Sequence, residues 1–183
     1  MDKIKFATIW LAGCSGCHMS FLDMDEFLID LADLVEVVYS PVGCDLKEYP
    51  DGVDVCLVEG AVANEDNLEL IYQVRRRTQT LISFGDCAVT ANVPAMRNLL
   101  REGAKPVLER GYLELADENP HFPHAPGIVP ELLDRVLPVH EVVPIDIFMP
   151  GCPPSADRIR ATLEPLLQGQ SPAMVGREMI KFG

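Results

Sequence analysis

Positively charged residues are scarce in this 183-residue sequence. Its 15 Lys and Arg stand against 28 Asp and Glu, which gives a formal net charge of −13. A surface of that sign repels the phosphates of nucleic acid and of anionic membranes, so we expect neither as a partner. The sequence also lacks a run of roughly 18 apolar residues, the length that a membrane-spanning helix needs. It contains no internal repeat, low-complexity tract or domain linker.

A usable export signal is also lacking at the start of the sequence. The short apolar stretch there runs directly into cysteines at positions 14 and 17, whereas a signal peptide is separate from the working residues of the mature protein. We therefore expect a cytoplasmic protein, in which thiols stay reduced and grouped cysteines indicate metal binding or catalysis. The length is that of one ordinary domain, and 48% of the residues are hydrophobic, so residues 1–183 are expected to fold as a single domain.

Apolar segments alternate with amphipathic segments along the chain. The pattern predicts an α/β fold, a doubly wound, flavodoxin-like parallel sheet of about five strands. Asn64 is the expected N-cap of the second long helix. The strands are predicted at residues 3–11, 34–39, 53–59, 80–84 and 142–148. The helices are predicted at residues 19–32, 64–76, 90–101 and 155–167, with a short one at 129–136 inside an irregular excursion over 101–138.

Four of the six cysteines follow predicted strands. Cys14 and Cys17 follow the first strand, Cys87 follows the fourth in Gly-Asp-Cys-Ala, and Cys152 follows the fifth in Gly-Cys-Pro-Pro. Loops that leave the carboxyl ends of parallel strands open on the same edge of a sheet, so these thiols are expected to converge. Four converging thiolates favour a metal or iron–sulfur site, and neighbouring glycines would let the backbone approach a bulky inorganic core. A [4Fe–4S] cluster fits four cysteines on three loops.

Other chemistries share parts of this pattern. A Cys-x-x-Cys at a strand-to-helix turn occurs in thioredoxin-like redox pairs, but that interpretation leaves Cys87 and Cys152 unexplained. The segment Cys-Ser-Gly-Cys-His at 14–18 matches the attachment pattern of c-type haem, which usually accompanies export. Zinc also prefers four thiolates, although structural zinc usually draws on two close pairs. Buried, inert cysteines are the remaining interpretation; we adopt it for Cys56 and favour it over a reactive thiol for Cys44.

Glu59 ends a predicted buried strand at the same edge, where an ionised carboxylate is costly unless it is paired. It has either a structural partner, as a salt bridge or helix cap, or a hydrogen-bonding or proton-handling role at a subunit interface. His18 is expected to start a helix and donate a hydrogen bond near the cysteines. Arg75, Arg76 and Arg77 are interpreted as a solvated helix end, with docking to an acidic partner as the alternative.

Taken in order, these motifs resemble the small subunit of [NiFe] hydrogenases over essentially the whole chain. The resemblance is carried by Cys14-x-x-Cys17, Val58-Glu59-Gly60, Gly85-x-Cys87-Ala88 and Gly151-Cys152-Pro153-Pro154. The segment at residues 11–23 is most similar to the bidirectional NAD(P)-linked type, the Hox small subunit. It reads Leu-Ala-Gly-Cys-Ser-Gly-Cys-His-Met-Ser-Phe-Leu-Asp. Related cluster subunits of respiratory complex I carry adjacent cysteines at the first site, whereas Ser15 and Gly16 separate them here. Asp86 stands where such sequences often have Thr or Ser.

The resemblance implies a hydrogenase complex in which separate subunits carry out H2 chemistry, electron transfer and NAD(P) reduction. This chain would hold the proximal [4Fe–4S] cluster on Cys14, Cys17, Cys87 and Cys152. The Ni–Fe centre, which splits or makes H2, would lie in a separate large subunit, and electrons would pass to diaphorase iron–sulfur and flavin subunits that reduce NAD(P). A flavodoxin-like electron carrier with bound FMN and a complex-I-like cluster subunit are the alternatives.

Overall fold

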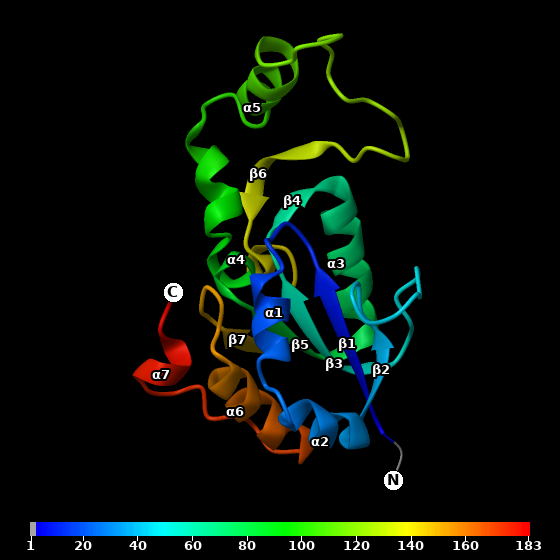
Figure 1. Ribbon diagram of the computed structural model, residues 1–183, viewed down its shortest axis with the longest axis vertical. Helices are drawn as coiled ribbons and strands as arrows, with labels where there is room; N and C mark the ends of the chain where they lie inside the picture. The colour runs from blue at the N-terminus through cyan, green and yellow to red at the C-terminus, as the bar shows by residue number, and fades with distance from the viewer. Residues whose placement is uncertain (1–2) are drawn as a thin grey trace.

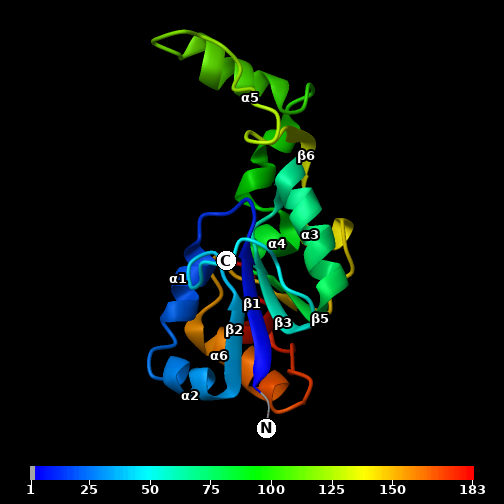
Figure 2. The same ribbon diagram turned by 90° about the vertical axis from the view of Figure 1, so that its right-hand side faces the viewer.

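The computed structural model describes residues 3–183, and its centre is a sheet of five parallel strands (Figures 1 and 2). The strands lie in the order β2-β1-β3-β5-β7. Their bounds are Ile4–Trp10 for β1, Val35–Tyr39 for β2, Val53–Glu59 for β3, Thr78–Phe84 for β5 and Ile147–Met149 for β7. This order of second, first, third, fourth and fifth strand is the flavodoxin-like one, so the predicted fold class is confirmed. Within the described residues, no helix is both long and apolar enough to cross a bilayer.

Helices cover both faces of the sheet. On one face, α1 (Gly16–Leu22), α2 (Phe27–Leu34) and α6 (Ala156–Leu167) pack over a core that includes Leu57. On the other face, α3 (Glu65–Arg77) and α4 (Asp86–Thr90) pack over a core that includes Val58. Successive residues of a strand point to opposite faces, which is why these neighbours in β3 belong to different cores. Both are fully buried, as the unbroken apolar run in β3 predicts.

The N-terminus of α3 lies where the sequence predicts it. The side chain of Asn64 accepts a hydrogen bond of 2.8 Å from the backbone N–H of Asn67, which satisfies a donor of the first turn. Glu65 and Asp66 occupy that turn and three arginines occupy the last, an arrangement that the helix dipole favours at both ends.

The three arginines at the end of α3 are not equivalent. Arg75 donates to the Asp146 carboxylate at 2.7 Å and to backbone carbonyls. Arg77 pairs with Asp51 at 2.9 Å and also donates to a carbonyl. The interpretation as a solvated helix end is therefore wrong for Arg75 and Arg77, and it describes only the exposed Arg76.

Two predicted helices are interrupted by residues with positive φ. The helix predicted at 19–32 is in fact α1 and α2, because Asp25 between them has φ 48°. The helix predicted at 90–101 is also wrong in its bounds. α4 begins at Asp86 and ends at Thr90, because Ala91 and Asn92 have φ of 64° and 24°, and a 3₁₀ helix, η1 (Val93–Leu99), follows. Positive φ is rare for residues with a side chain and cannot continue a right-handed helix.

The short helix predicted at 129–136 is wrong. Most of this segment belongs to the strand β6 (Leu132–Leu137), which pairs antiparallel with β4 (Val62–Asn64) in a second, two-stranded sheet. The strand predicted at 142–148 is much shorter. The 3₁₀ turn η3 (Val139–Glu141) continues into a turn and bend at 142–143, Pro144 follows with no N–H to donate, and β7 begins only at Ile147.

The irregular excursion predicted over 101–138 projects from one end of the molecule (Figures 1 and 2). Its two short helical pieces are α5 (Lys105–Glu109) and the π-helical turn η2 (Arg110–Glu114). The last helix, α7 (Arg177–Ile180), lies within residues 176–183, which we call the C-terminal segment.

Candidate functional site

The four predicted cysteines lie on three loops at the carboxyl edge of the sheet. Cys14 lies between β1 and α1, and Cys17 lies in the first turn of α1. Cys87 lies in the first turn of α4, and Cys152 lies in the loop between β7 and α6. Cys17 is buried, Cys87 is partly buried, and Cys14 and Cys152 are exposed. All six cysteines of the chain are free thiols.

The four thiols are near enough to affect one another electrostatically. Burial raises the pKa of Cys17 far above its ordinary value, and the Glu59 carboxylate, Cys87, Cys14 and Cys152 raise it further. Burial likewise raises the pKa of Cys87, and Cys152 and Cys14 add to the effect. The Cys17 and Cys87 thiols are therefore costly to ionise unless a positively charged centre compensates their charge. This donor set therefore fits a metal-containing group.

Glycines leave space beside the cysteines. A Cβ placed on Gly85, whose φ is 85°, would overlap the Cys17 sulfur. A Cβ on Gly151, at φ 136°, would lie 2.5 Å from Cα of Pro154. Both positions therefore demand glycine. Gly85 brings the backbone against the Cys17 thiol, and Gly151 permits the tight turn of the loop that carries Cys152.

A single metal ion and a four-iron cluster make different demands on the ligands. Among residues 3–183, no three His, Cys, Asp or Glu side chains are near enough to one another to hold one metal ion. One ion needs its ligands within a single coordination shell, whereas a [4Fe–4S] cluster spaces its four thiolates around a larger core.

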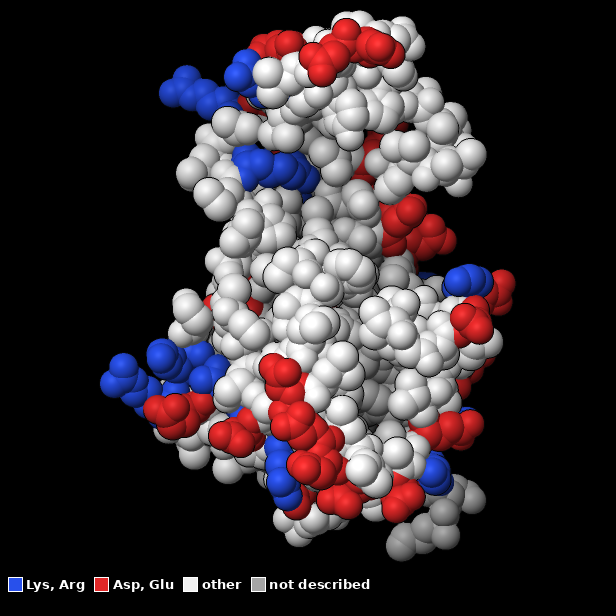
Figure 3. Space-filling view, in the orientation of Figure 1, with Lys and Arg blue, Asp and Glu red and all other residues white. Residues whose placement is uncertain are grey.

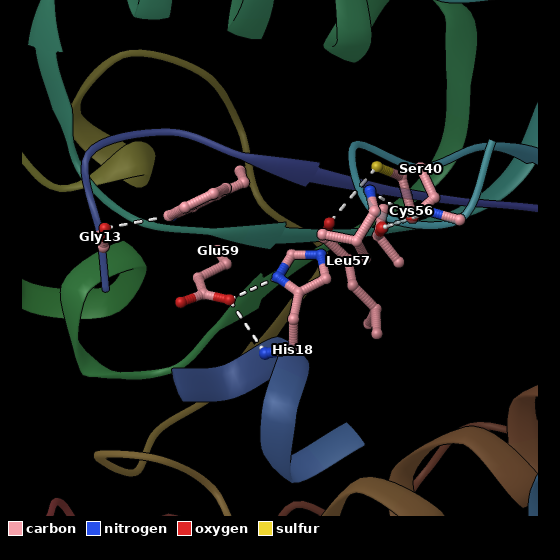
Figure 4. A network of polar contacts seen from close by, with 10 residues as sticks. Gly13, His18, Ser40, Cys56, Leu57 and Glu59 are labelled. Carbon is pink, nitrogen blue, oxygen red and sulfur yellow. Dashed lines mark hydrogen bonds and ion pairs between the residues drawn. The ribbon is translucent and has the colours of Figure 1, made fainter. Parts of the chain in front are cut away.

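Glu59 and His18 form a buried pair next to this site (Figure 4). Glu59 is 1% exposed, and its Oε2 accepts a hydrogen bond of 2.9 Å from the backbone N–H of His18 and contacts His18 Nδ1. The N-cap residue Ser15 makes no side-chain bond, so Glu59 caps α1 from the neighbouring strand. The predicted structural role of Glu59 is thus observed. His18 lies in the first turn of α1, at the start of the helix as predicted, and both its backbone N–H and its Nδ1 contact Glu59.

Sequence analysis did not identify the side chains that hold the loop of Cys152 (residues 150–154). Asp86 accepts a hydrogen bond of 2.6 Å from the backbone N–H of Gly151 through Oδ1, and the backbone N–H of Asp86 donates to the carbonyl of Gly151 at 2.8 Å. The Ser20 hydroxyl donates to the carbonyl of Pro154 at 2.6 Å. In the sequence, only Asp86, the unusual acid beside Cys87, indicated a special role. The groups that Asp86 and Ser20 bond to are backbone atoms far away in the sequence, which no local pattern predicts.

The remaining two cysteines have ordinary structural surroundings. Cys56 is fully buried within β3, and burial raises the pKa of its thiol to about 12, as expected of an inert core residue. Cys44 lies in the turn after β2, where its sulfur accepts a hydrogen bond of 3.0 Å from the N–H of Ser40.

Fold and thiols together define a class of protein, a flavodoxin-like domain with four cysteines grouped at the carboxyl edge of its sheet. The chain belongs to the family of the NADH ubiquinone oxidoreductase 20 Kd subunit, which it matches over residues 14–166. It is 42% identical over 172 residues to the NAD-reducing hydrogenase HoxS subunit delta of Cupriavidus necator, which covers 92% of this chain and 80% of that protein. It is 36% identical over 174 residues to a subunit of the F420-non-reducing hydrogenase vhu of Methanococcus voltae, covering 94% of this chain but only 59% of the relative.

Solved structures agree with these sequence relationships. The fold matches a chain of an NAD+-reducing [NiFe]-hydrogenase in the H2-reduced state with a TM-score of 0.92, at 36% identity and over 100% of both chains. A [NiFeSe]-hydrogenase of Dm. baculatum matches with a TM-score of 0.60 at 17% identity, over 92% of this chain and 63% of that one, and shows a shared fold alone. The predicted resemblance to the small subunit of NAD(P)-linked [NiFe] hydrogenases is confirmed.

Proposed function

We propose that this chain is the electron-transfer subunit of a [NiFe] hydrogenase and that Cys14, Cys17, Cys87 and Cys152 hold one [4Fe–4S] cluster. The observation that carries the proposal is the grouping of four free thiols on the three loops that follow β1, β5 and β7, at one edge of the sheet. When bound, such a cluster supplies one-electron transfer. The chain's own residues supply the thiolates, shield part of the group from water and set the charge around it.

Partner subunits provide the rest of the chemistry in this proposal. The relative in Cupriavidus necator is a subunit of an NAD-reducing hydrogenase, and the matching structure is of an NAD+-reducing [NiFe]-hydrogenase. We infer a large subunit with the Ni–Fe centre, diaphorase iron–sulfur and flavin subunits with the NAD(P) site, and a cytoplasmic location. A zone with few charged side chains, across the middle of the face in Figure 3, supports burial of this part of the surface against another protein.

Serine substitutions test which cysteines hold the cluster. Serine keeps the size of cysteine but is a poor ligand for iron, so Cys87→Ser should lose the cluster. The matched control is Cys56→Ser, which changes a buried thiol outside the site and should keep the iron while lowering stability. The measurement is iron and sulfide content of anaerobically purified protein. About four irons per chain in the Cys87→Ser protein would contradict the proposal.

An absorption spectrum separates the cluster from the alternative of an FMN-binding electron carrier. The cluster gives one broad shoulder, whereas a flavin gives two resolved bands. The loop after β1, where a flavodoxin-like fold would bind phosphate, carries Cys14 and Cys17 instead of a row of Ser and Thr donors. A flavin would therefore be additional to the cluster.

A further inference from the structure

Arg158, in the first turn of α6, is a buried cation with no acidic partner among the described residues. It is 8% exposed, and its guanidinium bonds to backbone carbonyls instead of a carboxylate. Nε donates to the carbonyl of Glu178 at 2.6 Å, and Nη1 donates to the carbonyls of Lys181, at 2.8 Å, and of Pro150. A buried charge is tolerated only where hydrogen bonds replace water. The backbone around Arg158 is thus arranged to hold it.

These bonds connect two segments that are distant in sequence. Glu178 and Lys181 belong to the C-terminal segment, whereas Pro150 begins the loop of Cys152. In Figure 1 the C-terminal segment, in red, lies beside this loop. One guanidinium therefore joins the C-terminal segment to the loop that carries a candidate ligand.

Asp86 makes a second connection between the same two segments. It is 4% exposed, and each of its carboxylate oxygens accepts a bond from a different segment. Oδ1 accepts from the N–H of Gly151 at 2.6 Å, and Oδ2 accepts from the N–H of Gly183 at 2.9 Å. Bonds from backbone N–H to a carboxylate are stronger than bonds between neutral groups. The loop of Cys152 is thus held by the Asp86 carboxylate at Gly151 and by the Arg158 guanidinium at Pro150.

Between these two connections, the C-terminal segment touches the candidate ligand itself. A Cβ on Gly183 would lie 2.5 Å from the backbone nitrogen of Cys152 and 2.6 Å from its Cβ. No side chain fits there without displacing Cys152.

We propose that the C-terminal segment is a clasp on the loop of Cys152, and that Arg158 and Asp86 are positioning residues that hold the clasp closed. The clasp keeps the Cys152 thiolate in place on the cluster and limits the access of water and chelators from that side. Removing residues that orient a ligand typically lowers metal affinity by 10–100-fold. The inference rests on the proposed function, because it requires a cluster at this site.

The first test is the rate at which an iron chelator removes iron from the anaerobically purified full chain with its co-purifying partners. Arg158→Gln should raise this rate about tenfold, in the range for residues that orient ligands. Removal of residues 177–183 should raise it by a similar factor. Because both changes open the same clasp, the combined variant should be no faster than either alone, whereas independent effects would multiply. Arg160→Gln is the control. This exposed neighbour on α6 pairs with Glu164 and lies over the Phe27 ring, and it makes no hydrogen bond to the C-terminal segment or to the loop of Cys152 among the described residues.

A milder pair of variants tests the same contact without removing a charge. Gly183→Ala should push the segment away from Cys152 and raise the rate of iron loss, whereas Gly111→Ala should not, because a Cβ there meets nothing within 4 Å.

The reduction potential of the cluster provides a readout that a simple loss of stability would not move. Arg158→Gln should lower the potential, because a positive charge favours the reduced form of the cluster, and Arg158→Lys should lower it less.

Two negative results are distinguishable. An unmodified chain without iron would overturn the proposed function and the clasp with it. An iron-loaded chain whose Arg158→Gln and Gly183→Ala variants lose iron at the unmodified rate would overturn the clasp alone.

Discussion

Glu59 lies beside the four thiols and serves the site through the helix that it caps. Its carboxylate bonds to the first turn of α1, the turn that contains Cys17. It also raises the pKa of that cysteine. A negative charge in this place favours a centre with compensating positive charge over a free thiolate. Its suggested part in hydrogen-bond or proton traffic between subunits stays a prediction.

Glu59→Gln separates these roles. Glutamine keeps an acceptor for the His18 N–H but removes the negative charge opposite the ring, so the unfolding free energy should fall by about 1–2 kcal/mol. Chemical denaturation measures this loss, and Glu69→Gln, at an exposed position on α3, should change it by less than about 0.5 kcal/mol. Lower H2-dependent NAD(P) reduction by an assembled complex with an unchanged cluster spectrum would support the functional role. Normal turnover per assembled complex would limit Glu59 to a structural role.

At the scale of elements, the small β4–β6 sheet depends on a side chain from another element. Asn98 in η1 donates to the carbonyl of Val136 and accepts from its N–H, both at 2.8 Å. Asn98→Ala would leave both groups of β6 without these partners, a change that costs about 1–3 kcal/mol per buried group. We expect faster amide hydrogen exchange over residues 132–137 and little change in the main sheet. Gln79→Ala, on an exposed position of β5, should leave this exchange unchanged.

This dependence explains why the sequence predicts the main sheet better than the second one. The strands of the main sheet are apolar runs, and the cysteines follow them directly, so local patterns predict both the fold and the grouping of the site. Strand β6 has exposed and partly exposed residues, and its partners, β4 and Asn98, are far away in the sequence. The contacts of Asp86 and Arg158 are likewise bonds to distant backbone groups, which leave no periodic pattern.

At the scale of the whole molecule, the proposed function requires that the edge with the cysteines face a partner. Met19 is 60% exposed on α1, directly after Cys17 and His18, whereas Ile29 is 69% exposed on α2. A charge at the centre of an interface disfavours association. Met19→Glu should therefore reduce co-purification with a nickel-containing large subunit by about 30-fold, which corresponds to the roughly 2 kcal/mol of an interface hot spot.

Ile29→Glu is the matched control, because it places the same charge at a similarly exposed apolar position on another helix. It should leave co-purification unchanged, and both variants should keep their iron. The measurement is the ratio of nickel to iron in the complex purified through a tag on this chain. Equal ratios for the two variants would contradict an interface at Met19.

The distribution of the cysteines over three loops has a consequence for biosynthesis. Cys14 leaves the ribosome early, but Cys152 follows the last strand of the sheet, so the four-thiol site is incomplete until nearly the whole fold has been synthesised. If the chain has the proposed function, insertion of the cluster must therefore come late in synthesis. Once present, a cluster joins segments that are far apart in the chain, much as a crosslink closes large loops and thereby disfavours the unfolded ensemble. Loss of iron would then lower the stability of the fold as well as remove the redox centre.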